Sequence, residues 1–444
     1  MNRIIKWFLF AFLVFACFNT EAQAQVNAAS CSQSDVQNAI NSASAGQTVN
    51  VPAGSCNWTS LNLAKAITLS GAGQGATTIS LGNGSTAWAI TKQTSGVTRI
   101  RNFTLTVTNN MATPHAVTVS GPWPNGQPVI FENDAIVLND ADFVTIQTPG
   151  GVIFSHITFT GTWGSTLLTG KDTNDNASWT TADTMGTKDT TGFANIYVED
   201  STFNGGTITD CDDGCRIVVR HNIGKDSGGF NSHGKDTSPI GMRHFEIYSN
   251  SFLFPDKSCP GGSPLSPSNI NQWIWIRGGT GVIYSNNFDS LNSSCWGNKV
   301  EWKFAIRGAE DVKPAGTCGA TSYPVSHQLG QSNNGSSDFT DPIYVWGNVS
   351  NDALNPTLRI EADSGWEWGN PCGFNWNNYF QWGRDAINTS LTSLVLSTIG
   401  GTVDGAGGTG KPGYAAYAYP HPLISGQTSA SSPVAPSGLT ATVQ

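Results

Sequence analysis

The chain has 444 residues, of which only 12% are charged, and its formal net charge is −9. An acidic chain with so few charges is a poor general partner for nucleic acid, because phosphates attract basic surfaces. Glycine is abundant, at 50 residues. The length alone allows two or three compact domains or one elongated β fold.

Residues 1–24 have the pattern of a secretory signal peptide. Arg3 and Lys6 precede an apolar run from Trp7 to Phe18, and Ala22-Gln23-Ala24 supplies the small residues that a signal peptidase recognises. The apolar run is too short to span a bilayer comfortably, and no later segment is long enough. We expect cleavage near Ala24 and export to the extracellular or periplasmic space, with no membrane association afterwards.

The cysteine count agrees with export. Cys17 leaves with the signal, and an even number of cysteines in an exported chain favours disulfide bonds over zinc, which would need paired CxxC spacing. Proximity in the sequence suggests the pairs Cys31–Cys56, Cys211–Cys215, Cys259–Cys295 and Cys318–Cys372.

The first predicted element of the mature chain is a short helix over residues 35–43. Its apolar residues recur at helical spacing, and Ser34 is available as the N-cap. Short glycine-punctuated strands follow at 48–51, 66–70 and 77–81. A helix ahead of such strands predicts a capped stack of β coils, since the helix covers the open end of the stack.

A repeat runs through the rest of the chain. The sequence of residues 247–252 returns at 283–288 with Tyr-Ser-Asn and a final Phe in common, and looser copies occur at 97–105, 152–159, 196–203, 217–223 and 344–349. Its phenylalanines are separated by 44, 49 and 36 residues, which indicates coils of roughly 20–30 residues, some skipped and some carrying long loops. We expect Asn250 and Asn286 to stack at one turn as scaffold residues.

These motifs together resemble the right-handed parallel β-helix superfamily of the pectate lyases. The resemblance rests on the helix, on Thr-Val-Asn-Val-Pro-Ala-Gly at 48–54, on Ile-Thr-Leu-Ser-Gly-Ala-Gly at 67–73 and on the Asn-x-Phe repeats. It implies an all-β fold, a right-handed single-stranded parallel β-helix (solenoid) with an N-terminal capping helix and long loops, over residues 25–424. Residues 413–423 resemble a segment that ends many secreted bacterial β-helix proteins, and 425–444 read as a Ser/Pro/Ala-rich linker and short tail. The superfamily holds lyases, hydrolases, esterases, epimerases and non-enzymatic proteins, so the fold alone selects no activity.

The basic residues gather in one stretch of the chain. Five of them fall within 28 residues, accompanied by three of the seven histidines: Arg216, Arg220, Lys225, Lys235 and Arg243, with His221, His233 and His244. Cations concentrated on adjacent coils of an acidic protein indicate an anionic ligand. The alternative for any one of them is a local ion pair with a neighbouring carboxylate.

Side-chain alternation predicts which residues face outward. In the run 273–278, period two places Ile274 and Ile276 in the core, so that Trp273, Trp275 and Arg277 point outward. The run 303–308 repeats this arrangement with Lys303 and Arg307. If the glycines that follow these runs mark the same turn, successive coils form one ladder of His233, Arg277 and Arg307. The coil before this ladder supplies three aspartates, Asp210, Asp212 and Asp213.

This ladder favours a lyase that cleaves an acidic, uronic-acid-containing polysaccharide by β-elimination. The reaction needs a base at C5 and a cation that neutralises the carboxylate. The candidate catalytic residues are His233, Lys235, Arg277, Arg307, Arg243 and Tyr248. The candidate substrate-binding residues are Trp273, Trp275, Lys303, Arg220 and Trp366. Asp210, Asp212 and Asp213 are the candidate ligands of a calcium ion, and no other cofactor is expected.

Two alternatives remain open at this stage. A polygalacturonase-like hydrolase would use paired carboxylates, for which Asp212-Asp213 with Ser232-His233-Gly234, or the group Glu361, Asp363 and Glu367, are the candidates. A sugar-binding or adhesive solenoid would use the tryptophans without catalysis. In all three cases the partner is a polysaccharide, and a solenoid with covered ends is expected to be a monomer.

Overall fold

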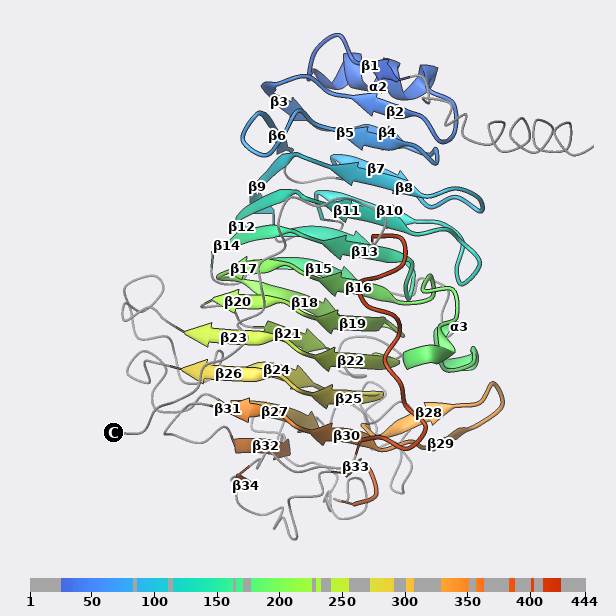
Figure 1. Cartoon of the computed structure of the whole chain (residues 1–444), viewed down its shortest axis with the longest axis vertical. Coiled ribbons are helices and arrows are strands. Elements are labelled where there is room, and N and C mark those ends of the chain that lie inside the picture. Colours follow the sequence, from blue (N-terminus) through green and yellow to red (C-terminus); the bar gives the residue numbers. More distant parts are fainter. Residues whose placement is uncertain are drawn as a thin grey trace, which may run out of the picture.

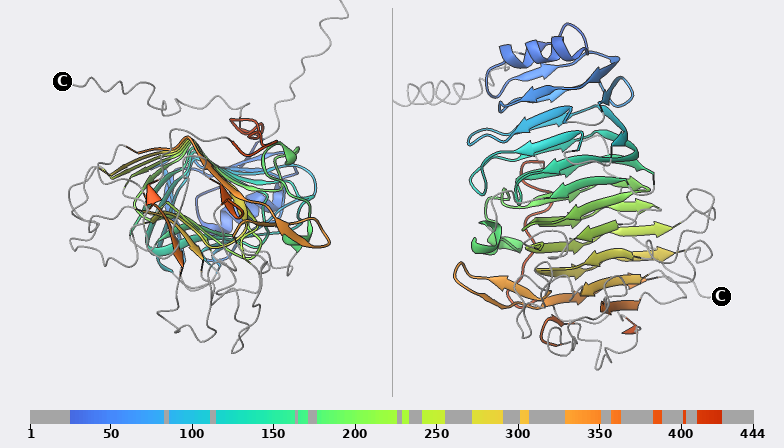
Figure 2. Two further views of the ribbon diagram at one scale, coloured as in Figure 1. Left: turned by 90° about the horizontal axis from the view of Figure 1, so that it is seen from below. Right: turned by 180° about the vertical axis from the view of Figure 1, so that it is seen from behind.

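The structure is a computed structural model of the chain. It describes residues 25–82, 86–110, 115–162, 165–170, 177–225, 229–232, 241–254, 272–290, 301–306, 329–350, 357–362, 383–387, 401–402 and 410–424. Within these residues the fold is all-β, a tall stack of short strands whose long parallel sheets curl around a common core (Figures 1 and 2).

Three ladders of strands make up the stack. We call them sheets A, B and C, and β12 joins B to C because it runs through both. Sheet A consists of β1 (Val26–Asn27), β2 (Thr48–Asn50), β5 (Thr68–Ser70), β8 (Thr98–Arg101), β11 (Val129–Glu132), β13 (Val152–Ser155), β16 (Ile196–Glu199), β19 (Arg216–Arg220), β22 (His244–Tyr248), β25 (Thr280–Tyr284), β30 (Ile343–Trp346) and β33 (Ala386–Ile387). Sheet B consists of β3 (Gly54–Trp58), β6 (Thr77–Leu81), β9 (Thr104–Asn110), the first part of β12 (Ala135–Ile146), β14 (Thr158–Gly161), β17 (Thr202–Asn204), β20 (Ile223–Lys225), β23 (Ser251–Phe254), β26 (Asn287–Ser290) and β31 (Val349–Ser350).

Sheet C consists of β4 (Leu61–Leu63), β7 (Trp88–Thr91), β10 (Val117–Ser120), the second part of β12, β15 (Thr166–Gly170), β18 (Thr207–Cys211), β21 (Gly229–Ser232), β24 (Gln272–Ile276), β27 (Glu301–Ile306), β32 (Thr357–Ala362) and β34 (Gly401–Thr402). The last of these pairs antiparallel with β32. A separate antiparallel hairpin is formed by β28 (Gln331–Asn333) and β29 (Asp338–Thr340). The helical elements are α2 (Gln33–Ser42), α3 (Ala177–Thr180) and the 3₁₀ turn η1 (Gly186–Lys188).

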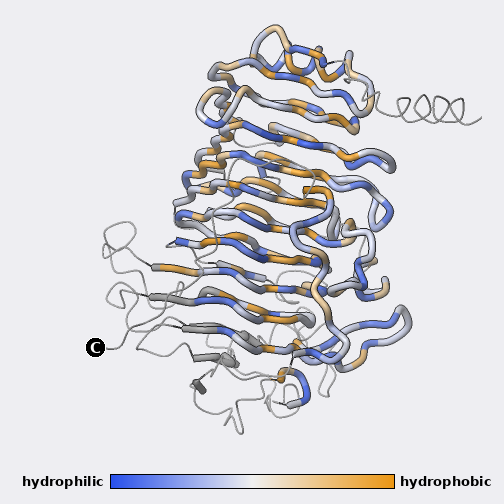
Figure 3. Tube along the Cα trace, viewed as in Figure 1, coloured by the Kyte–Doolittle hydropathy of each residue, from blue (hydrophilic) through white to orange (hydrophobic). Residues whose placement is uncertain are grey.

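Parallel register places equivalent residues of successive coils in columns. Phe159 lies opposite Phe203, and Phe252 lies opposite Phe288. Gly224 stands between Phe203 and Phe252 in the same column, so the interval of 49 residues contains two coils, as the spacing predicted. Alternation along the strands turns apolar residues into the core, and the outward residues are polar in many strands, which appears as alternating colours in Figure 3.

The turn from sheet A to sheet B has one conformation in successive coils. Residues other than glycine adopt the left-handed region there. They include His156, His221, Ser249 and Ser285, with φ between 52° and 56°. Ile157 follows His156, but in the later coils the next residue is an asparagine, and these asparagines form a ladder of buried amides. The side chain of Asn250 donates to Asn286 Oδ1 at 2.9 Å, and the ladder continues through Asn222 and Asn348. The predicted stacking of Asn250 on Asn286 is confirmed.

A helix lies at the N-terminal end of the stack, close to the predicted position. It spans Gln33–Ser42 instead of 35–43, and its N-cap is Ser32 instead of Ser34. The Ser32 hydroxyl accepts the Asp35 backbone N–H at 3.3 Å, which Ser34 cannot do from inside the first turn. The buried side chains Val36, Ala39 and Ile40 join the main core. Two of the expected disulfide bonds are present, Cys31–Cys56 and Cys211–Cys215, while the other two pairs lie outside the described residues.

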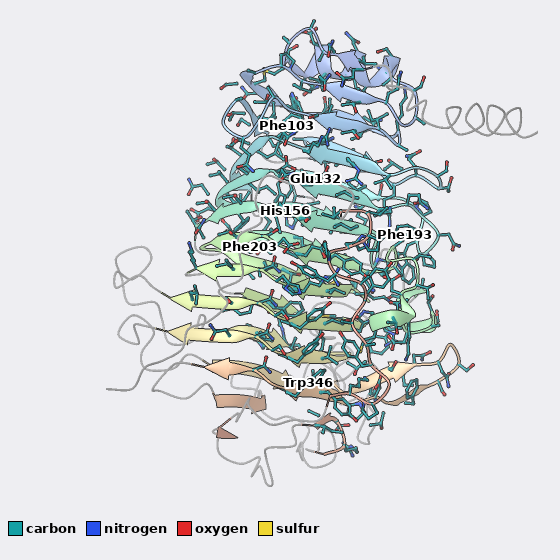
Figure 4. All side chains as sticks on the ribbon, in the orientation of Figure 1. Phe103, Glu132, His156, Phe193, Phe203 and Trp346 are labelled. Atoms are coloured by element: carbon teal, nitrogen blue, oxygen red, sulfur yellow. A yellow bond between two sulfur atoms is a disulfide. The ribbon has the colours of Figure 1, made fainter. Side chains whose placement is uncertain are left out.

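Residues 410–424 form an extended segment that we call the strap. It runs along the outer face of sheet A, against the direction of the coils, from the level of β30 to that of β13 (Figure 1, red). Beneath it lies a second apolar cluster, separate from the main core, which contains Ile130, Ile153, Tyr197 and Val218 together with Ile424 of the strap. Figure 4 labels Glu132 and Trp346, which belong to the same outer column of this sheet.

Candidate functional site

The outer face of sheet C carries a continuous polar column. Parallel register brings Thr118, Thr145 and Thr169 of successive coils into line, followed by Asp210, Asn231 and Trp275. Lys303 is the next register position, opposite Trp275. The column therefore changes along the stack from hydroxyls, through a carboxylate and an amide, to an aromatic ring and the position of a cation.

The predicted alternation in β24 is confirmed where side chains are described. Ile274 and Ile276 are fully buried in the core, whereas Trp275 is partly exposed. Arg277 directly follows the strand and places its guanidinium carbon 4.4 Å from the centre of the Trp275 ring, a cation–π geometry. Its Nε donates to the Ser232 carbonyl at 2.5 Å and its Nη2 to Asn231 Oδ1 at 3.5 Å. Because Asn231 in turn donates to Asp210 Oδ1 at 3.2 Å, one polar chain links Arg277 to Asp210.

The predicted alignment of the two Ile-Arg-Gly sequences is wrong. Ile276 lies opposite Phe304, two residues before Ile306, while Arg307 itself lies outside the described residues. A shift of two residues leaves the inward and outward faces unchanged, which is why alternation alone did not reveal it.

A second polar group lies further up the same face. His115 Nε2 is 3.1 Å from Thr169 Oγ1 and 3.7 Å from Asp142 Oδ2. Burial raises the pKa of Asp142 to about 6; the Thr166 backbone N–H, at 2.8 Å, opposes the rise and the negative charge of Asp210 adds to it. A carboxyl group with such a pKa is partly protonated near neutral pH and can donate a proton. Sequence reasoning missed Asp142 and His115, because they come from different coils, one from β12 and the other from just before β10.

The three aspartates proposed as calcium ligands sit at the turn after β18. Asp210 is in the strand, whereas Asp212 is 5% exposed and accepts the Asp213 backbone N–H at 2.8 Å. The Cys211–Cys215 disulfide closes this turn. In the described part of the chain, no three His, Cys, Asp or Glu side chains converge in a way that would hold a metal ion.

Three further candidates belong to sheet A instead. Arg220 and Tyr248 are neighbours in the outer column beneath the strap, where the guanidinium donates to the Tyr248 hydroxyl at 2.9 Å and to the strap carbonyls of Tyr417 and Ala418. Arg220 is fully buried and Tyr248 is 3% exposed. Arg243 is also fully buried, beside the face of Trp179. These three are therefore not brought together with Trp275 and Arg277, and the first two hold the strap.

The remaining candidates are placed only in part. Trp273 and Lys303 belong to β24 and β27, so their strand positions are known. His233, Lys235, Arg307 and Trp366 lie outside the described residues, as do Asp363 and Glu367 of the alternative carboxylate group.

Comparison with known proteins assigns no relative to the chain: no family model matches it, and no curated protein matches it. Among the described residues, the structure contains no helix with the length and apolar character needed to cross a membrane.

Proposed function

We propose that the chain is a secreted right-handed parallel β-helix that binds an acidic polysaccharide and cleaves it by β-elimination. The β-helix assignment is supported by the three sheets, which the chain visits in a fixed order with parallel register, and by the contact of α2 with β1, β3 and β4 at one end, where a cap belongs. Export is supported by the two disulfide bonds.

The single observation that carries the proposal is the pairing of Arg277 with Trp275 on the outer face of sheet C. An aromatic ring offers a surface for the C–H face of a sugar, and a guanidinium beside it matches the geometry of a carboxylate. The protein is acidic overall, and Arg277, which is 3% exposed, is a cation held beside a partly exposed ring. Together they fit a uronic acid residue.

In the proposed reaction, Arg277 lowers the cost of charge build-up on the uronate carboxylate while a base removes the C5 proton. The electron pair of the broken C5–H bond forms the C4–C5 double bond, and the C4–O bond breaks so that the oxygen departs with its bonding pair and takes up a proton. No water is consumed, and the products are a shortened chain and an unsaturated uronate. His233 and Lys235 are the proposed bases, because they follow Ser232, to whose carbonyl Arg277 is bonded.

Hydrolysis is the second candidate, favoured by one specific observation. Asp142, with its raised pKa, and Asp210 influence each other electrostatically on the same face. A glycoside hydrolase uses such a pair, one carboxyl group as the acid and a second carboxylate nearby. A binding protein without catalysis would use the same aromatic and cationic pair.

The deciding experiment incubates the purified protein with pectate, alginate, glucuronan and glycosaminoglycans. Elimination gives absorbance near ~235 nm from the unsaturated product of proton removal at C5. Arg277→Met should abolish that signal, and Arg384→Met, a control just before β33 of sheet A where Arg384 pairs with Asp385, should leave it intact. New reducing ends without the absorbance indicate hydrolysis, and binding without cleavage indicates the third class.

A further inference from the structure

A group of buried polar atoms lies where sheet A meets α3 and the β28–β29 hairpin. Within the described part of the chain, Arg243 Nε and Nη1 have no hydrogen-bond partner, and the same is true of the Gln331 side-chain amide and of Ser332 Oγ. All three side chains are fully buried. His244 is also fully buried, and its ring makes only a 3.4 Å contact between Nδ1 and Asp183 Oδ1.

Arg243 is enclosed by both loop elements. Its guanidinium lies 5.2 Å from the centre of the Trp179 ring of α3, and its Nη2 donates to the Asn333 carbonyl of β28 at 3.2 Å. The start of β28 is fixed beside the same coil, because the Gly330 N–H donates to the Gly279 carbonyl at 2.9 Å. Arg243 Nε and Nη1, which lie on different edges of the guanidinium, are therefore enclosed in this corner without a bonded partner.

The nearest carboxylates do not neutralise Arg243 directly. Asp183, Asp338 and Asp341 act on it electrostatically, but each is engaged elsewhere. Asp183 contacts Lys188 and His244, Asp338 accepts from Asn333, and Asp341 pairs with Lys411 of the strap. A buried guanidinium left without a bonded counter-charge is costly, by several kcal/mol in typical cases.

We propose that this corner is a binding site for a small monovalent anion of halide size, held by the Nε–H group of Arg243. One positive charge calls for one negative charge, and the complete burial of the side chains around it restricts the ligand to a small one. Gln331 of β28, whose buried side-chain amide has no bonded partner in the described part of the chain, is the candidate second donor. The anion would fasten α3 and the hairpin onto sheet A, so it is a structural ligand and is independent of the proposed chemistry on sheet C.

The test measures thermal unfolding of the whole chain at constant ionic strength while sodium gluconate is replaced by sodium chloride or sodium bromide. We expect a saturable rise in Tm of about 2 °C, because a ligand that binds only the folded state stabilises it. Arg243→Met should remove the halide response. Arg216→Met is the matched control, since Arg216 is equally buried but its donors are bonded to Ser178, Ala182 and Thr184; it should lower Tm and keep the response.

A crystal grown in bromide gives the second measurement and uses the unaltered chain, so it decides the matter even if Arg243→Met fails to fold. An anomalous bromide peak within hydrogen-bond distance of Arg243 Nε supports the proposal. A water molecule at that position, a Tm that does not respond to halide, or the same halide response in Arg243→Met would each overturn it. A bromide peak without any response in solution would also count against it.

Discussion

Arg220 and Glu199 form a fully buried ion pair across neighbouring strands of sheet A, with Nη2 and Oε2 2.7 Å apart. Each also holds the strap: Arg220 donates to two strap carbonyls, and Glu199 Oε1 accepts the His421 backbone N–H at 3.0 Å. Burial raises the pKa of Glu199, and the positive charge of Arg220 opposes the rise. The pair is therefore the central attachment of the strap to the stack.

Removing one partner should be strongly destabilising. Arg220→Met leaves the Glu199 carboxylate buried without its counter-charge, and we expect a loss of about 3–5 kcal/mol in the free energy of unfolding. Denaturant unfolding measures this, and limited proteolysis should show new cleavage within the strap. The double change Arg220→Met with Glu199→Leu should recover much of the loss. Equal losses in the single and double variants would contradict this account.

The amide ladder should be sensitive to a single deletion. Asn250 Nδ2 donates to the Val219 carbonyl and to Asn286 Oδ1, both at 2.9 Å, and its Oδ1 accepts from Asn222. Asn250→Ala leaves several buried groups unpaired, each costing about 1–3 kcal/mol. We expect a loss of at least 3 kcal/mol by denaturant unfolding, roughly the sum over such groups. Asn57→Ala, at an exposed position of β3, should change stability by less than about 0.5 kcal/mol.

Glu246 should make stability depend on pH. Burial raises the pKa of Glu246 to about 7; hydrogen bonds from the Gly186 N–H and the Tyr414 hydroxyl oppose the rise, as does the charge of Arg220, while that of Asp183 adds to it. Between the unfolded value of about 4.3 and about 7 the folded state binds more protons, so this group's contribution falls as pH rises through that window. The total fall is about 4 kcal/mol.

Buried histidines oppose this trend in the wild type, so the measurement is a difference. Burial lowers the pKa of His244 and of His421 to about 4, which makes their contribution rise with pH between about 4 and 6.5. Unfolding free energies of Glu246→Gln and the wild type should be compared at pH 5 and pH 8. The unfolding free energy of the variant should rise relative to that of the wild type between pH 5 and pH 8. A difference in unfolding free energy that does not vary with pH would show that Glu246 is charged at both pH values.

Trp275 should contribute to affinity for the polysaccharide. Trp275→Ala removes the ring that supports Arg277, and we expect about a tenfold weaker Kd, equivalent to ~1.4 kcal/mol. Calorimetric titration with oligouronides measures it. Trp346→Ala is the matched control, because Trp346 is partly exposed on sheet A, stacked 4.4 Å from Tyr284; its loss should lower stability and leave the affinity unchanged.

The sequence predicted the parts of the fold that repeat locally. Phe159, Phe203, Phe252 and Phe288 form one column because each coil supplies one residue to it, and a skipped coil is visible as a doubled interval. The two nearest cysteine pairs were also predictable from their separation. Register was not, since period-two alternation is satisfied equally well after a shift of two residues.

Contacts between distant segments explain the other differences. Arg220 lies 198 residues from Ala418 in the sequence, and nothing local to either indicates that they meet. A cation cluster seen only in sequence therefore combined residues of two sheets: Arg216 and Arg220 on sheet A, and Lys225 on sheet B. Candidate site residues in a coiled stack are separated by column, and columns become known only when the register is known.

The strap also alters how the stack can come apart. A row of coils held only by its neighbours can fray from either end, one unit at a time. Here Arg99, on β8, donates to the Leu423 carbonyl, and Asp341, just before β30, pairs with Lys411. The two ends of the strap thus tie an early coil to a late one. The coils between these attachments cannot separate without releasing the strap, so they should unfold as a single cooperative unit.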